Sequence, residues 1–261
     1  MNKRIWELDF LRGFAIIMMV FDHLMYDFMY LPNYFSNYHS VDNSVFNFLN
    51  ELGYQYWISD LRFFGHFFFV SVFLIVSGIS FTFSKNNLSR GLKLAVVALL
   101  ITLVTYGLSF LISGVIIVFG IIHLYALSII IIYFLRKIIK NELVLLVIAL
   151  AIIAYGIIIK FYHPFYIGTF TWAKLPDIII GLRAYGADHF GLVPYLGIII
   201  LGTVLGNTFY KNKVSLIPSV KMSEKNIFSI AGRRSLLIFV THQVVLILLI
   251  YIIGYIFGYR F

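Results

Sequence analysis

The chain contains no cysteine and few charged residues, and each shortage excludes a class of protein. Without cysteine there is no disulfide framework, no thiolate nucleophile and no cysteine-ligated metal. Charged residues make up only 12% of the 261 positions, whereas a soluble globular domain has about 25%. The five prolines lie mainly in loops, and no Pro-, Gly- or Ser-rich linker divides the chain, so we expect a single domain over residues 1–261.

Hydrophobic residues make up 61% of the chain, and they are gathered into seven long runs. Each run can cross a membrane, which takes roughly 20 apolar residues. The runs cover residues 10–31, 64–84, 92–113, 115–135, 143–162, 191–210 and 235–257. The predicted fold is therefore all-α: a polytopic membrane helix bundle of about seven transmembrane helices.

The distribution of Lys and Arg predicts the orientation of this bundle. Alternate connections hold fifteen and five of these residues, and the positive-inside rule places the richer set in the cytoplasm. The N-terminus is then cytoplasmic and, after seven crossings of the cell membrane, the C-terminus is external. The net charge of +9 lies at cytoplasmic membrane edges, where anionic lipids attract it, so we expect a bilayer partner and no nucleic acid.

Two predicted external connections are long, at about residues 32–63 and 163–190. In the first, Val45, Phe46, Leu49, Leu52 and Tyr56 recur at helical spacing, which predicts a short helix in the outer interface. In the second, residues 175–182 are apolar but too few to span. They form either a re-entrant segment over a cavity or an interfacial loop.

Two small-xxx-small pairs predict close helix packing. They are Gly202 with Gly206, and Gly254 with Gly258.

The first apolar run carries the main candidate site. Arg12 and His23 are eleven residues apart; three helical turns take about 10.8 residues, so both project from one face, roughly 16 Å apart. Asp27 lies one turn beyond His23, where a carboxylate can fix the histidine tautomer. Asp22 points about 100° away and faces either another helix or a substrate. The alternative is an anchoring arginine and a packed histidine.

Four other histidines are candidates for the same site. His123 and His242 lie inside predicted spans, His66 opens the second span, and His39 lies in the first external loop. His123 shares the predicted depth of His23, and His242 either lines a donor channel or bonds across the bundle. His66 contacts substrate or lies at the interface. Since the histidines are scattered and form no HExxH motif, no metal is predicted.

Several strings of residues resemble one family. Residues 6–15, Trp-Glu-Leu-Asp-Phe-Leu-Arg-Gly-Phe-Ala, running on to His23, resemble the opening of membrane acyltransferases related to heparan-α-glucosaminide N-acetyltransferase. They also fit the Arg-x10-His pattern of the broader transmembrane acyltransferase superfamily. Similar stretches follow at 68–83 around Ser77-Gly78, 119–123, 194–206 and 232–243. The likeness therefore covers nearly the whole chain.

The resemblance implies transfer of an acyl group from cytosolic acyl-CoA to an external glycan, lipid-linked or small-molecule acceptor. Arg12 would then serve the donor end and His23 the catalytic end, with His123 and His242 in the remaining motif positions. The animal lysosomal enzyme differs: it has more transmembrane helices, a lumenal domain and Asn where this chain has His23. Its active histidine lies in the first external loop, which makes His39 a rival catalyst and substrate contact.

Thioester acyl transfer needs a base for the acceptor proton and cations or amides for the developing oxyanion. We expect Arg12, Arg233 and Arg234 to bind the acyl-CoA phosphates, while His23, oriented by Asp27, deprotonates an amine or hydroxyl. An acyl-histidine intermediate is the alternative route.

Two other functions remain open from the sequence. One is a proton-coupled transporter with a relay of Asp22, His23, Asp27 and His123, although no inverted repeat is visible. The other is a non-catalytic membrane protein. The number of copies in the assembly is also open, with a homo-oligomer among the possibilities.

Overall fold

The fold was analysed in a computed structural model that describes residues 5–111, 114–162, 170–220, 223 and 225–260. Over these residues the structure is helical, with one isolated bridge between Ile117 and Gly186 and no strand, so the all-α prediction is confirmed. The helices are, in chain order, α1 (Trp6–Met29), α2 (Leu31–Tyr34), the 3₁₀ helix η1 (Tyr38–Ser40), α3 (Ser44–Trp57), α4 (Asp60–Phe83), α5 (Asn87–Leu108), α6 (Ile121–Ile138), α7 (Glu142–Tyr162), the 3₁₀ helix η2 (Trp172–Lys174), α8 (Leu175–Ile180), α9 (Leu192–Phe209), α10 (Ile227–Arg233) and α11 (Ser235–Ile256).

Six helices of the described part of the chain are long and apolar enough to cross a membrane: α4, α5, α6, α7, α9 and α11. The remaining predicted span, residues 10–31, corresponds to α1, which has the same 24-residue length as α4. It stands outside the six because it carries more charged residues than they do: Glu7, Asp9, Arg12, Asp22 and Asp27. At about 1.5 Å per residue α1 still measures some 36 Å, which exceeds a hydrocarbon core of about 30 Å.

The chain forms two compact units, and α4 runs from one into the other. The first unit comprises residues 1–73 and 217–261, and the second comprises residues 74–216. The expectation that the whole chain acts as one domain stays a prediction, as does the orientation of its termini.

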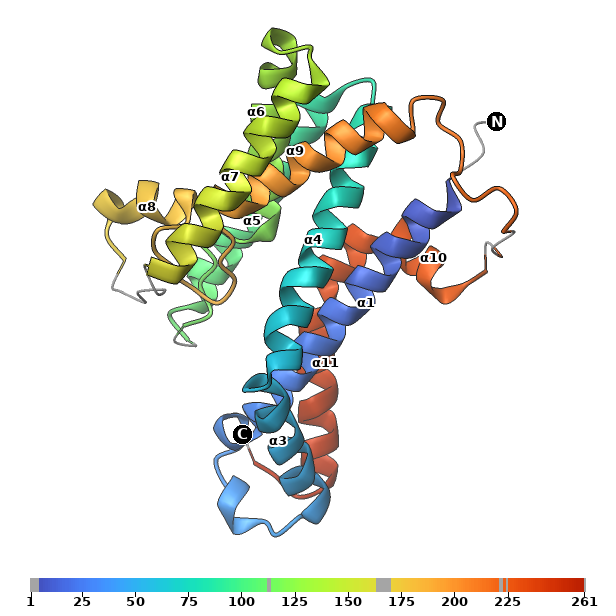
Figure 1. The fold of residues 1–261 in the computed structure, drawn as a ribbon. Helices are drawn as coiled ribbons and strands as arrows, with labels where there is room; N and C mark the ends of the chain where they lie inside the picture. The colour runs from blue at the N-terminus through green and yellow to red at the C-terminus, as the bar shows by residue number, and fades with distance from the viewer. Residues whose placement is uncertain (1–4, 112–113, 163–169, 221–222, 224, 261) are drawn as a thin grey trace. The chain divides into compact units, whose positions relative to one another are not determined.

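The first unit is built around α1, which packs on α3, α10 and α11 (Figure 1). Two glycines let α1 and α10 touch through their backbones: a Cβ on Gly13 would lie 1.6 Å from the carbonyl oxygen of Phe228, and one on Gly232 would lie 1.9 Å from that of Asp9. α10 ends at Arg233 and α11 starts at Ser235. α1 therefore meets residues more than 200 positions away along much of its length.

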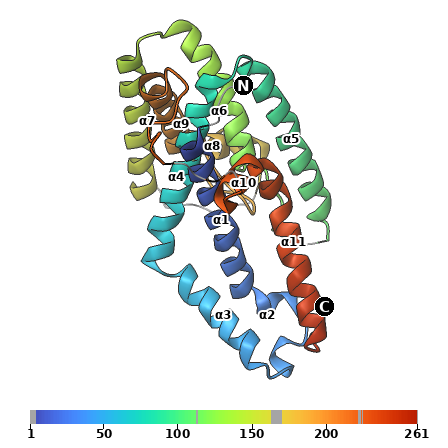
Figure 2. The ribbon, with the colours of Figure 1, turned by 90° about the vertical axis from the view of Figure 1, so that its right-hand side faces the viewer.

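The far end of α1 is covered by α2, which Figure 2 shows between the ends of α1 and α11. A cluster of buried apolar side chains fills this region: Leu31, Phe35, Tyr38, Phe46, Ile250 and Tyr259. The backbone nitrogen of Ser36 donates to the carbonyl oxygen of Arg260 at 2.9 Å, and that of Arg260 donates to Asn37 at 2.7 Å. These hydrogen bonds hold the C-terminal residues against the first long loop. The same loop contains α3, which confirms the predicted short helix.

The second unit pairs α7 with α9 and α5 with α6 (Figure 1). The end of α4 packs on α9, where a Cβ on Gly202 would lie 2.3 Å from the carbonyl oxygen of Ile75. Gly206 likewise lies against Thr82, so this small-residue pair packs as predicted. In the first unit Gly254 lies against the Phe35 ring, whereas Gly258 has φ +86° with no atom near its Cβ position. The second predicted pair is therefore wrong at Gly258, which forms a turn.

Two predicted segments of the second unit differ from their sequence description. The span predicted over residues 115–135 begins as helix only at Ile121, because the carboxylate of Asp188 accepts from the backbone nitrogen of Ile121 at 3.2 Å. The preceding segment pairs with the next loop, where the backbone nitrogen of Ala187 donates to Ile116. Residues 175–182 contain the six-residue helix α8; residues 163–169 of the same connection lie outside the described part.

Candidate functional site

Two imidazoles meet where α1 faces α11. The ring centroids of His23 and His242 are 4.7 Å apart, and the ring planes are nearly perpendicular at 84°. Nδ1 of His23 lies 2.9 Å from the carbonyl oxygen of Met19, and Nδ1 of His242 lies 2.8 Å from that of Phe239. Because a carbonyl oxygen only accepts, Nδ1 carries the hydrogen in both rings. Each neutral imidazole therefore keeps its lone pair on Nε2, as a general base requires.

Two neighbouring side chains of α11 hold acceptor atoms that lack a donor. Nε2 of His242 and Oε1 of Gln243 are buried and have no hydrogen-bond partner within the described residues. Gln243 donates through Nε2 to both carboxylate oxygens of Asp27, at 2.8 and 3.0 Å, and this turns its Oε1 away from Asp27. Leaving a buried acceptor unsatisfied costs about 1–3 kcal/mol. Two such atoms on adjacent residues make this part of α11 a candidate for ligand binding.

Asp27 is completely buried and ties three helices together. Besides the two bonds from Gln243 of α11, it accepts one from the hydroxyl of Tyr34 in α2 at 2.8 Å. Burial and the Asp27 carboxylate both raise the pKa of Tyr34, which therefore stays a hydrogen donor. The His23 ring is fixed by its own Nδ1–H, which donates to the carbonyl oxygen of Met19. Asp27 thus positions α2 and α11 beside the imidazoles, and its catalytic role stays a prediction.

Asp22 belongs to a separate polar cluster between α1, α3 and α4. It is 8% exposed, pairs with Arg62 at 3.2 Å and accepts from the hydroxyl of Tyr56 at 3.1 Å. The Arg62 guanidinium also lies over the Trp57 ring, 3.8 Å from its centroid. Burial, and then the nearby Asp22 charge, raise the pKa of Tyr56 to about 12. The structure thus gives Asp22 a structural partner; contact with substrate stays a prediction.

The three predicted donor-binding arginines gather at the crossing of α1 and α10. Arg12 precedes Gly13, and Arg233 follows Gly232, the two glycines at which these helices touch. Arg12 is half-buried and lies 3.4 Å from the Asp9 carboxylate, while Arg233 and Arg234 are exposed. The crossing therefore brings a basic edge together from opposite ends of the sequence.

The remaining candidate histidines occupy other positions. His39 is exposed in η1, beside the Tyr38 ring, and His66 is half-buried on α4. His123 belongs to the second unit, where its Nδ1 accepts from the backbone nitrogen of Gly120 at 3.2 Å and its Nε2 lies 2.9 Å from the Thr102 hydroxyl. Its surroundings are those of a helix-capping residue. The predictions that these three act in the site remain untested.

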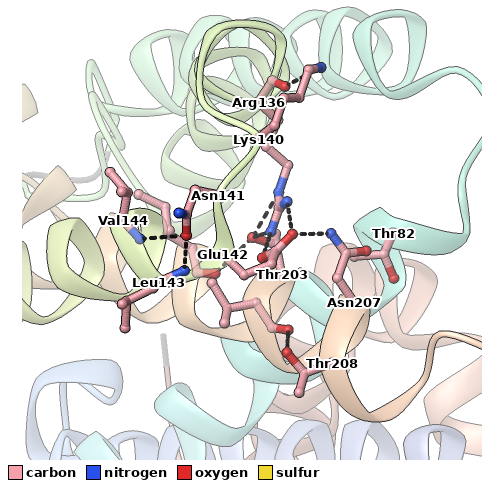
Figure 3. Close-up of polar contacts among 12 residues, drawn as sticks. Thr82, Arg136, Lys140, Asn141, Glu142, Leu143, Val144, Thr203, Asn207 and Thr208 are labelled. Carbon is pink, nitrogen blue, oxygen red and sulfur yellow. Dashed lines mark hydrogen bonds and ion pairs between the residues drawn. The ribbon is translucent and has the colours of Figure 1, made fainter.

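A polar network in the second unit was missed by the sequence reasoning (Figure 3). Arg136 donates to both oxygens of Glu142, at 2.8 and 3.0 Å, and to the Thr203 hydroxyl at 2.8 Å. Asn207 adds a bond to Glu142 at 2.7 Å. The network joins the facing ends of α6 and α7 to α9. Its only sequence signal is an acid six residues after an arginine in a predicted short connection.

The long apolar helices define a polytopic membrane protein, and α1 and α11 carry its paired imidazoles. The family model described as "Heparan-alpha-glucosaminide N-acetyltransferase, catalytic" matches residues 4–244. The chain belongs to this family, which makes it a membrane-embedded acetyltransferase and confirms the resemblance seen in its motifs. The match takes in α1 and the first half of α11, and therefore both imidazoles. No curated protein and no solved structure gave a match.

Proposed function

We propose that the protein transfers an acetyl group from cytosolic acyl-CoA to an amine or hydroxyl of an external acceptor, with His23 as the general base. The acceptor class we favour is carbohydrate, and the compartment is the cell membrane. The observation that carries the proposal is the pairing of His23 with His242 on helices that both belong to the family match.

Phosphate binding fits the basic edge at the α1–α10 crossing. Arginine forms planar, paired hydrogen bonds with phosphate oxygens, and Arg12, Arg233 and Arg234 lie at the helix ends where the cytoplasmic surface is predicted. From Arg12 to His23 the helix rises about 16 Å. A donor held by its phosphates at this edge would extend its thioester along α1 to the imidazoles.

In this proposal the proton of the acceptor passes to Nε2 of His23 as the acceptor oxygen or nitrogen attacks the thioester carbonyl. The new C–O or C–N bond replaces the C–S bond, and the leaving thiolate takes up a proton to become the free thiol of CoA. Proton transfer by a positioned group contributes about 10²–10⁴-fold to such a rate. Direct transfer requires no acyl-enzyme, so labelled acetyl-CoA alone should leave no label on the protein after rapid quenching.

The test compares His23→Ala with His39→Ala in purified protein, using labelled acetyl-CoA and a panel of amino sugars and glycans. We expect His23→Ala to lose at least about a hundredfold in transfer, and His39→Ala to keep wild-type activity. Retained transfer in His23→Ala would refute the base assignment.

Donor binding is measured separately, as protection against thermal unfolding. A ligand at 100 times its Kd stabilises a protein by about 2.7 kcal/mol. We expect CoA to protect wild type and His23→Ala alike and to protect the double variant Arg233→Met/Arg234→Met less. No protection of wild type at millimolar CoA would refute the donor and favour a transporter or a non-catalytic protein.

A further inference from the structure

The proposed reaction needs a proton donor as well as a base, because a thiolate leaves when the C–S bond breaks. A second imidazole lies beside the first: His242 faces His23 at 4.7 Å between ring centroids. Its Nδ1–H is held by the carbonyl oxygen of Phe239 at 2.8 Å, so only Nε2 can take up or release a proton. That atom is buried and has no partner in the described part of the chain.

We propose that His242 is the general acid that protonates the leaving thiolate, an inference that rests on the proposed function. One histidine would then act on the acceptor and the other on the donor.

Two imidazolium rings at this separation would repel each other, so the pair favours only one extra proton, on one of the two Nε2 atoms. One ring is then an acid while its neighbour is a base. Gln243, the next residue on α11, donates to Asp27 of α1, which also accepts from the hydroxyl of Tyr34. The Asp27 carboxylate also interacts electrostatically with the His23 imidazole, so it favours a positive charge on the pair.

The assignment of roles follows from the helix that carries each ring. α11 starts directly after Arg233 and Arg234, the proposed phosphate contacts. His242 lies eight residues beyond Arg234, about 12 Å along the axis, on the donor's predicted path.

The proton count closes over one turnover. His23 takes the acceptor proton as the C–O or C–N bond forms, and protonated His242 gives its proton to sulfur as the C–S bond breaks. Transfer of the proton from His23 to its neighbour His242 restores the starting state. No oxidant, metal or further reactant is required.

The test varies the leaving group. With acetyl-CoA, His242→Ala should lose at least about a hundredfold in transfer. With the acetyl thioester of 4-nitrothiophenol, whose thiolate leaves without protonation, the same variant should lose less than tenfold, whereas His23→Ala should lose activity with both donors. Equal losses of His242→Ala with the two donors, or retained transfer from acetyl-CoA, would overturn the proposal.

A second measurement needs acetyl-CoA alone. If His242 must be protonated, wild-type kcat falls at alkaline pH, and the variant His242→Gln loses this alkaline limb along with most of its activity. An unchanged limb would overturn the proposal. The matched control is Thr241→Ala, an exposed neighbour on α11 whose hydroxyl donates to the carbonyl oxygen of Leu237 in the same helix; it should retain wild-type rates. Failure of the proposed function is distinguishable, since His23→Ala would then stay active.

Discussion

The closest backbone contact of the first unit yields a sharp prediction for Gly13→Ala. The added Cβ would lie 1.6 Å from the carbonyl oxygen of Phe228 and 2.7 Å from the backbone nitrogen of Gly232. Ordinary carbon contacts begin near 3.4 Å, so α10 must retreat by about 2 Å, and both obstacles are backbone. Overpacking of this kind costs about 1–3 kcal/mol, occasionally more. The better helix propensity of Ala returns at most about 1 kcal/mol.

The net change is therefore a destabilisation of up to about 2 kcal/mol, and we expect the upper end because both obstacles are backbone atoms. For a chain of this size each kcal/mol lowers Tm by about 2–4 °C. The assay is thermal unfolding of the detergent-solubilised protein, followed by tryptophan fluorescence. The retreat of α10 also separates Arg233 from Arg12. We expect the KM for acyl-CoA to rise about tenfold, since a hydrogen bond to a charged group contributes about 1.5–3 kcal/mol.

Gly107→Ala is the matched control, because Gly107 lies inside α5 and a Cβ there meets no atom within 4 Å. This variant should gain up to about 1 kcal/mol from helix propensity and keep its donor KM. If Gly13→Ala proved as stable as Gly107→Ala with an unchanged KM, the reasoning that the α1–α10 crossing assembles the donor edge would be refuted.

Three further predictions concern other polar clusters. Arg136→Met should lower the free energy of unfolding by about 1–3 kcal/mol, less than for a fully buried ion pair because the Glu142 side chain is a third exposed. In thermal unfolding, the double variant Arg136→Met/Glu142→Leu should recover at least half of that loss. His123→Ala should lower stability by about 1 kcal/mol through lost capping with kcat retained, whereas a hundredfold loss of kcat at unchanged Tm would make His123 catalytic. The pKa of Tyr56 is raised to about 12, so this residue stabilises the fold below pH 10 and loses the contribution as the pH rises from about 10 to 12. The measurement is the tyrosine absorbance titration of the wild type minus that of Tyr56→Phe, and a midpoint near pH 10 would contradict the prediction.

The sequence predicts the bounds of a helix well where a hydrophobic run alone determines where the helix begins and ends. The runs at 64–84 and 235–257 correspond to α4 and α11, although α4 begins four residues before the predicted run. The run at 115–135 failed at its beginning because hydropathy does not distinguish helix from extended backbone. There the helix start depends on Asp188, which is 67 residues away from the nitrogen it caps.

The candidate site was predictable along one helix and not between helices. The spacing of Arg12 and His23 required only the helical period. The bonds from Gln243 to Asp27 join residues 216 positions apart, and no local pattern encodes such a pairing. Gln243 and Tyr34 were therefore missed as partners of Asp27, although Gln243 lies in a motif that carried the family resemblance.

The polar groups around the two imidazoles differ in how far their hydrogen bonds offset the cost of burying them. Asp22 has Arg62 and Tyr56, and Asp27 has Tyr34 and Gln243. A purely structural bundle would pair its imidazoles in the same way, because an unmet buried acceptor is destabilising. Instead His23 packs against a histidine whose Nε2 is buried without a donor among the described residues. The proton transfer that we propose for His242 would use this nitrogen.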